Sequence, residues 1–166
     1  MIDARFSLID HDGGAVTNDT YRGRHVIVFF GFTHCRVVCP RALSRISRAL
    51  ELLGSAADEF VPLYISVDPE RDTPAVMKTF LEKYPRFIGL TGPREEIDAT
   101  KKAFRVFAQK KSDATEPDGY VIPHTALTYL LDPNGDYLTH FADTIDELEL
   151  ATHLRKITAS GVVASA

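Results

Sequence analysis

Apolar and polar positions alternate along the first half of the chain in a way that predicts strands separated by helices. Residues 25–32, HVIVFFGF, form an unbroken apolar run, which is typical of a central strand covered on both faces. Leucine and isoleucine then recur at helical spacing over residues 40–54, with a proline at the expected first helical position. A second apolar run, 60–68, predicts another core strand, and a Thr-Pro pair predicts the start of a helix over residues 73–84.

The second half of the chain continues this alternation and closes with an antiparallel hairpin. We expect a short strand at 87–90 and a third helix from 93 to about 109. Residues 110–119, KKSDATEPDG, form a polar loop that is long for a turn. The segment 125–142 holds two β-rich runs joined by DPNG at 132–135, which is typical of a hairpin.

The two ends of the chain are expected to add little to this core. Residues 5–16 predict a small N-terminal hairpin, and a last helix is expected to begin near Ile145 and to give way to a disordered tail at 158–166. With 166 residues and 45% apolar composition, the chain is expected to form one domain, 1–166. The expected fold class is α/β: a mixed central sheet flanked by helices, with an N-terminal hairpin extension and a loop insertion before the His124-bearing strand.

Charge and hydropathy exclude some classes of partner. Nineteen basic and twenty-three acidic residues give a formal net charge of −4 without a basic run, which argues against a nucleic-acid partner. No stretch approaches the roughly 20 apolar residues that cross a bilayer. The first residues, MIDARFSLID, lack the pattern of a signal peptide, so we expect either a cytosolic protein or a chain whose leader or anchor was trimmed.

The two cysteines of the chain, Cys35 and Cys39, lie in one five-residue window between a predicted strand and a predicted helix. Structural disulfides are not distributed in this way, and the positive end of a helix favours thiolates. Two thiolates suit Cu(I), and an added imidazole gives a three-ligand set that copper can occupy in either oxidation state, whereas zinc ordinarily seeks a fourth ligand. A disulfide between the two sulfurs is the alternative, so redox chemistry stays open.

Three motifs in order along the chain resemble those of one known family. Residues 31–40, GFTHCRVVCP, resemble an FG-x-T-x-C-x-x-x-C-P signature, and residues 66–74, SVDPERDTP, resemble an SVDP-x-RDTP segment. Residues 120–135, YVIPHTALTYLLDPNG, resemble a stretch with a His, a strand and a DP-x-G turn. All three are features of the Sco/SenC family of cytochrome c oxidase assembly factors, and the resemblance extends over residues 6–157.

The resemblance implies a thioredoxin-like fold and one copper ion, as Cu(I) or Cu(II), held by Cys35, Cys39 and His124. It implies a metallochaperone for the binuclear copper centre of cytochrome c oxidase subunit II, or a reductant of the cysteines of that subunit. Family members usually act from a membrane-anchored position, and the copper centre faces the periplasm or the intermembrane space. The resemblance therefore implies a periplasmic or other extracytoplasmic location.

Two positions depart from the family pattern. Arg36 stands where many members have proline, which adds a cation beside the thiolates. Pro123 stands where many members have an aspartate, which removes a carboxylate that would help to orient the ring of His124. An Ile-Pro pair before a strand is also similar to the cis-proline that faces the cysteines of thioredoxins, which favours thiol exchange.

Other candidate residues are expected to support the site or the core. Asp68, Arg71 and Asp72 follow the end of a predicted strand, and we expect them to lie next to the cysteines; the alternative is a turn with local ion pairs. Met77 is expected in the core rather than on copper, and His34 is expected to point away from the neighbouring cysteine. The remaining histidines are expected to be structural or solvated: His11, His25, His140 and His153.

Two functions of different classes remain open. A copper-binding metallochaperone requires His124, whereas a thiol-disulfide oxidoreductase acting on the copper acceptor or another partner does not. The three residues between Cys35 and Cys39 favour metal, because two is the usual spacing in oxidoreductases. A peroxidase is disfavoured, because its attacking cysteine needs a threonine three residues and a proline seven residues before it, and neither Cys35 nor Cys39 has them.

Overall fold

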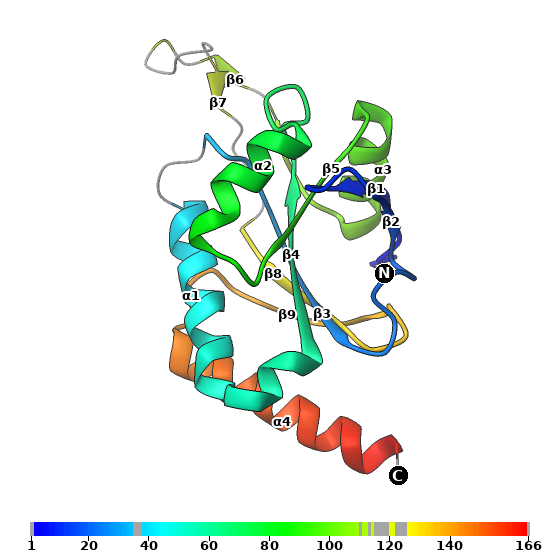
Figure 1. The fold of residues 1–166 in the computed structure, drawn as a ribbon, viewed down its shortest axis with the longest axis vertical. Coiled ribbons are helices and arrows are strands. Elements are labelled where there is room, and N and C mark those ends of the chain that lie inside the picture. Colours follow the sequence, from blue (N-terminus) through cyan, green and yellow to red (C-terminus); the bar gives the residue numbers. More distant parts are fainter. Residues whose placement is uncertain are drawn as a thin grey trace.

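The computed structural model describes residues 2–34, 38–109, 111–112, 114, 120–121 and 126–165. Seven strands form one mixed sheet in the order β2-β1-β5-β4-β3-β8-β9 (Figure 1). In chain order, these strands are β1 (Ser7–Asp10), β2 (Ala15–Thr17), β3 (His25–Gly31), β4 (Phe60–Ser66), β5 (Ile88–Thr91), β8 (Thr128–Leu131) and β9 (Tyr137–Phe141). The helices are α1 (Val38–Leu53), α2 (Pro74–Phe80), α3 (Arg94–Phe104) and α4 (Glu147–Ser165), with 3-10 turns η1 (Gly54–Glu59) and η2 (Leu81–Lys83).

The centre of the sheet is built from the two long apolar runs. Every residue of β3 and β4 is buried, and the two strands pair in parallel from His25–Phe60 to Gly31–Ser66. β5 continues the parallel part beside β4, while β8 pairs antiparallel with β3 on the other side. Parallel neighbours require crossover connections, which α1 and α2 supply. The carboxyl ends of β3, β4 and β5 therefore meet at one edge of the sheet.

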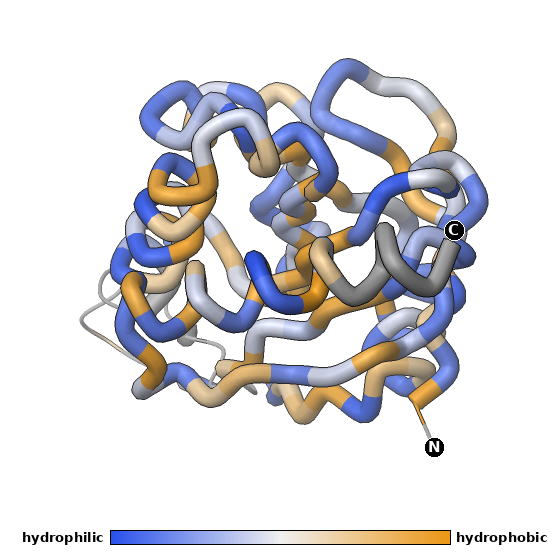
Figure 2. The backbone as a smooth tube through the Cα atoms, turned by 90° about the horizontal axis from the view of Figure 1, so that it is seen from below, coloured by the Kyte–Doolittle hydropathy of each residue, from blue (hydrophilic) through white to orange (hydrophobic). Residues whose placement is uncertain are grey.

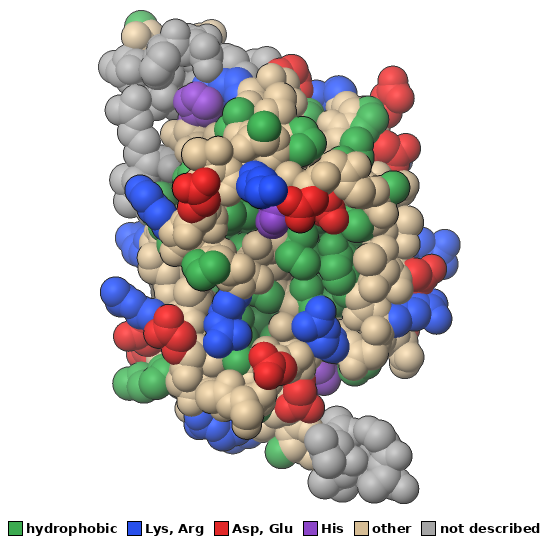
Figure 3. Space-filling view, in the orientation of Figure 1, with side chains coloured by type: hydrophobic (Ala, Val, Ile, Leu, Met, Phe, Trp, Pro, Cys, Tyr) green, Lys and Arg blue, Asp and Glu red, His purple; other side chains and the backbone are tan. Residues whose placement is uncertain are grey.

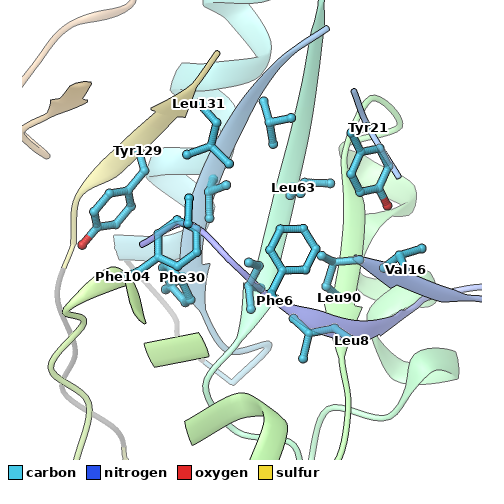
Figure 4. Packing of buried hydrophobic residues seen from close by; sticks show 14 of the residues in the cluster. Phe6, Leu8, Val16, Tyr21, Phe30, Leu63, Leu90, Phe104, Tyr129 and Leu131 are labelled. Atoms are coloured by element: carbon cyan, nitrogen blue, oxygen red, sulfur yellow. The ribbon is translucent and has the colours of Figure 1, made fainter. Parts of the chain in front are cut away.

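Apolar side chains cover both faces of this sheet. On one face the core joins the N-terminal hairpin to α3, and the ring of Phe30 meets Phe104 and Tyr129 edge to face at 5.2 and 5.9 Å between centroids (Figure 4). On the other face β3 and β4 pack against α1, α2 and α4 through residues such as Phe29, Leu50 and Leu154. The helices alternate between hydrophobic and hydrophilic residues along their length, as surface helices do (Figure 2).

The turns that join these elements follow the sequence pattern. The N-terminal hairpin of β1 and β2 and the hairpin of β8 and β9 both pair antiparallel, as predicted. In the second hairpin Gly135 has φ of +86°, a left-handed conformation that glycine adopts without strain. The hydroxyl of Thr73 accepts a hydrogen bond from the backbone N–H of Val76, and Pro74 opens α2. The predicted helix cap at Thr73 is therefore confirmed.

Several helix boundaries differ from the prediction, and α2 ends at Phe80, where the 3-10 turn η2 follows, rather than near residue 84. α3 ends at Phe104 rather than near residue 109, because Arg105 adopts a left-handed conformation (φ 57°) and its N–H closes the helix on Lys101 and Lys102. α1 begins at Val38, two residues before the predicted start. α4 continues past the predicted boundary at 158, where the buried hydroxyl of Thr158 donates to the carbonyl of Leu154 at 3.3 Å.

The polar stretch before the last hairpin also contains more structure than a loop. β6 (Lys111–Ser112) pairs antiparallel with β7 (Tyr120–Val121) in a separate two-stranded sheet. Within the described ranges, no helix is both long and apolar enough to cross a membrane.

Candidate functional site

Among the predicted metal ligands, only Cys39 belongs to the described residues. Cys39 occupies the first turn of α1, whereas Cys35 lies outside the described residues, in the connection between β3 and α1. Pro123 and His124 also lie outside the described residues, between β7 and β8.

The carboxylate of Asp72 joins the ends of neighbouring strands. Its Oδ2 accepts hydrogen bonds from the backbone N–H of Thr33 at 3.1 Å and from the hydroxyl of Ser66 at 2.7 Å, and its Oδ1 accepts from the hydroxyl of Thr33. The hydroxyl of Thr91 donates to the backbone carbonyl of Asp72 at 2.7 Å. Because these partners follow β3, end β4 and end β5, one fully buried residue ties together three carboxyl ends of the sheet.

A buried ion pair lies beside this carboxylate. The Nε of Arg71 donates to Oδ2 of Asp68, and the two side chains are 8% and 0% exposed. The guanidinium carbon of Arg71 lies 5.8 Å from the centroid of the Phe32 ring, within the range of a cation–π contact. The Asp68–Arg71 pair therefore contacts the residue that immediately precedes Thr33.

Burial dominates the electrostatics of Asp72. Desolvation raises the pKa of its carboxyl above the ordinary value, the hydrogen bonds from Thr33 and Ser66 lower the pKa, and the nearby charge of Asp68 raises it. Within the described ranges, no three His, Cys, Asp or Glu side chains come together as a metal site. The two aspartates thus support residues 32–34, which follow β3 and are called the β3 exit below, and do not form a metal cluster with other described residues.

The predicted supporting residues are therefore brought together, in two different ways. Asp68 and Arg71 form the local ion pair that was the alternative expectation, while Asp72 reaches 39 residues back along the chain to Thr33. Sequence reasoning did not assign a role to Thr33 or Ser66. Thr33 lies in the motif at 31–40 and Ser66 in the motif at 66–74. Their hydroxyl groups, which can donate hydrogen bonds to a carboxylate, were the signal that could have identified them.

The histidines other than His124 are dispersed. The Oγ1 of Thr33 lies 3.4 Å from the Nδ1 of His34, which is half-buried. His11 accepts a hydrogen bond from the N–H of Gly89 at 2.9 Å, and His25 packs on Phe60 with ring centroids 5.5 Å apart. Met77 is completely buried, as predicted for a core residue.

An open groove adjoins the β3 exit on the α2 side. It has a volume of about 450 Å³ and is lined by Thr33, Ala75, Val76, Thr79 and Phe80. On the face shown in Figure 3, hydrophobic side chains are exposed between charged ones. The groove next to Thr33 is thus lined mainly by apolar surface of α2.

Comparisons with known proteins agree with the motifs. A family model described as SCO1/SenC matches residues 1–159. The SCO2-like protein of Rickettsia felis is 37% identical over 137 residues, which are 82% of this chain and 67% of that protein. The mitochondrial SCO1 homolog of Homo sapiens is 35% identical over 162 residues, which are 93% of this chain and 54% of that protein. The chain thus spans about half the length of the human protein.

A solved structure gives the same picture in three dimensions. The structure of ScoI from Bradyrhizobium japonicum with copper bound matches with a TM-score of 0.85 and 40% sequence identity. The match covers 94% of this chain and 99% of that chain. The similarity therefore extends over nearly the whole chain.

Proposed function

Because the chain belongs to the SCO1/SenC family, we propose that it is a copper metallochaperone for the assembly of cytochrome c oxidase. The match to a Sco structure over 94% of the chain confirms the thioredoxin-like fold expected from the resemblance. The observation that carries the proposal is this match, at 40% identity, to a relative whose structure holds copper. The cargo of this chain is then a single copper ion.

The proposed ligands are Cys35, Cys39 and His124. Support for Cys39 comes from its place in the first turn of α1, where unpaired backbone N–H groups and the helix dipole favour a thiolate. Two thiolates and an imidazole form a donor set that both Cu(I) and Cu(II) accept. Oxidation of the two sulfurs to a disulfide would remove two of the three ligands, so the redox state of the cysteines would control copper loading.

The proposed acceptor is the binuclear copper centre of subunit II of the oxidase. This centre faces the periplasm or the intermembrane space, so we place the protein in an extracytoplasmic compartment, with the full-length protein held at a membrane. The mitochondrial name of the human relative agrees with such a compartment. Nucleic acid is not a partner in this proposal.

The second candidate is a thiol-disulfide oxidoreductase that reduces the cysteines of the acceptor or of another partner. The position of Cys39 at a strand-to-helix junction favours it, because the same junction activates thiols for exchange. The two candidates share Cys35 and Cys39 and differ in their need for His124.

Copper titration of the reduced protein in competition with a chelator tests the proposal. We expect one tightly bound Cu(I) per chain and, with Cu(II), a sulfur-to-copper charge-transfer band. His124→Ala should bind copper about 10- to 100-fold more weakly or worse, because removing a ligand costs at least as much as removing a residue that orients one. Cys39→Ser, which keeps one of the two sulfurs, should weaken and shift the band. His153→Ala is the matched control, because this exposed ring lies on α4 against Phe141 at 5.5 Å.

Two results would contradict the proposal. If the wild-type protein does not compete with the chelator for copper, the result would favour the oxidoreductase. Tight binding that His124→Ala leaves unchanged would remove His124 from the ligand set.

A further inference from the structure

The chain that leads to Cys35 leaves the sheet before it reaches the cysteine. The ladder between β3 and β4 ends at the Gly31–Ser66 pair, and the N–H of Val67 donates to the carbonyl of Gly31 at 2.8 Å. Beyond this pair, side-chain contacts of Phe32 and Thr33 help to set the direction of the chain.

The ring of Phe32 packs in the core, and further contacts come from two adjacent residues, Arg71 and Asp72. Arg71 lies over the ring of Phe32, and Asp72 binds both the N–H and the hydroxyl of Thr33. Two adjacent residues, 71 and 72, thus contact the two consecutive residues 32 and 33 that follow β3. Thr33 is the more tightly specified of the two, because hydrogen bonds to a carboxylate are short and directional.

The anchor itself is well fixed. The Asp72 side chain is fully buried, its backbone N–H donates to the carbonyl of Asp68 at 2.9 Å, and its carbonyl accepts from Thr91. A residue held from both its backbone and its side chain can transmit a fixed geometry to its partner. Thr33 lies two positions before Cys35 in the sequence.

We propose that Asp72 is a positioning residue for the copper site. Through Thr33 it fixes the direction in which the chain leaves β3, two positions before the proposed ligand Cys35, and copper binding depends on that direction. This inference rests on the proposed function of the cysteine pair. It assigns Asp72 no contact with the metal.

Ser66 provides a matched control inside the same network. Its hydroxyl donates to the same carboxylate oxygen of Asp72 at 2.7 Å and accepts from the N–H of Asp68 at 3.0 Å, but it ends β4 and does not lead to a cysteine. Ser66→Ala therefore removes a buried donor from Asp72 and leaves both bonds to Thr33. A purely structural role of the network would make Ser66→Ala and Thr33→Val equivalent.

The experiment compares Thr33→Val, Thr33→Ser, Asp72→Asn and Ser66→Ala by Cu(I) competition, by the Cu(II) charge-transfer band and by urea unfolding of the reduced, metal-free protein. Thr33→Val and Asp72→Asn should weaken Cu(I) binding about tenfold or more and shift the band, which is the size expected for a residue that orients a ligand. Thr33→Ser, which keeps the hydroxyl, should restore both readouts. Ser66→Ala should stay within about threefold of wild type although its urea midpoint falls as far as that of Thr33→Val.

Equal copper affinities of Thr33→Val and Ser66→Ala would overturn the proposal. Weaker copper binding in Asp72→Asn but not in Thr33→Val would also overturn it, because the carboxylate would then act on the site without Thr33. If wild-type protein binds no copper, the proposed function fails, and the positioning is read from the equilibrium of the cysteine pair with glutathione. In that exchange one glutathione disulfide oxidises both thiols and leaves as two glutathione thiols; a Thr33→Val equilibrium constant equal to that of Ser66→Ala would again refute the link.

Discussion

Replacing Arg71 by methionine should be among the most destabilising changes at this edge of the sheet. The change removes the guanidinium that neutralises Asp68, whose side chain is fully buried, and it removes the cation over Phe32. Methionine fills a similar volume, so the effect reports mainly on charge. The carboxylate of Asp68 would then remain in the core without its salt-bridge partner.

The expected cost follows from this burial. Removing one partner of a buried ion pair typically costs about 3–5 kcal/mol, because the other charge stays desolvated. For a chain of this size each kcal/mol lowers Tm by about 2–4 °C, so Arg71→Met should melt roughly 6–20 °C below wild type. Thermal and urea unfolding of the reduced, metal-free protein, followed by circular dichroism, measure both quantities.

The chain contains a matched control for this change. Arg22 and Asp19 form the same pair at the same sequence spacing, Nε to Oδ1 at 2.8 Å, but their side chains are 63% and 61% exposed. Arg22→Met should cost at most about 1 kcal/mol, as exposed ion pairs do. The reasoning would be refuted if Arg71→Met and Arg22→Met lowered the unfolding free energy equally.

Two further predictions concern the core and the pH dependence. A Cβ at Gly89 would lie 2.9 Å from Cδ1 of Leu81 and 3.2 Å from Cβ of Met77, so Gly89→Ala should cost about 1–3 kcal/mol in urea unfolding; a neutral result would contradict this crowding. Burial lowers the pKa of His25, so the unfolded chain takes up its proton at a higher pH than the folded chain, and stability is lost as pH falls through the ordinary value of 6.5. His25→Phe should therefore show a shallower fall in stability between about pH 7 and pH 5 in urea titrations at several pH values, and an unchanged slope would count against the assignment.

Much of the fold follows from the local pattern because its strongest signals are local. Every residue of β3 and β4 is buried, so each strand appears in the sequence as an unbroken apolar run that is easy to recognise. The DPNG turn fixes the last hairpin by its own chemistry. These elements needed no knowledge of the tertiary structure.

The predicted helix boundaries were wrong where tertiary contacts determine the end of the helix. Phe107 continues the helical spacing of α3 in sequence, yet it is 61% exposed, and the helix ends once Phe104 has reached the core. Spacing alone does not tell which apolar residue is the last to be buried. The left-handed cap at Arg105, a residue without glycine's freedom, carries no clear sequence signal.

The residues after β4 were predictable in outline and not in detail. The motifs singled out Asp68, Arg71 and Asp72, but they could not separate a local ion pair from a long-range hydrogen bond. The partners of Asp72 depend on the strand order, which brings Thr33 and Ser66 side by side. The roles of Cys35, Pro123 and His124 remain predictions, since these residues lie outside the described ranges.

X-ray absorption at the copper edge, on protein loaded with one equivalent of Cu(I), tests the central claim most directly. The account predicts two sulfur neighbours and one imidazole nitrogen around the metal in wild-type protein. In His124→Ala the nitrogen should be lost while both sulfurs remain. A wild-type spectrum with fewer than two sulfurs, or a nitrogen that persists in His124→Ala, would contradict the proposed copper site.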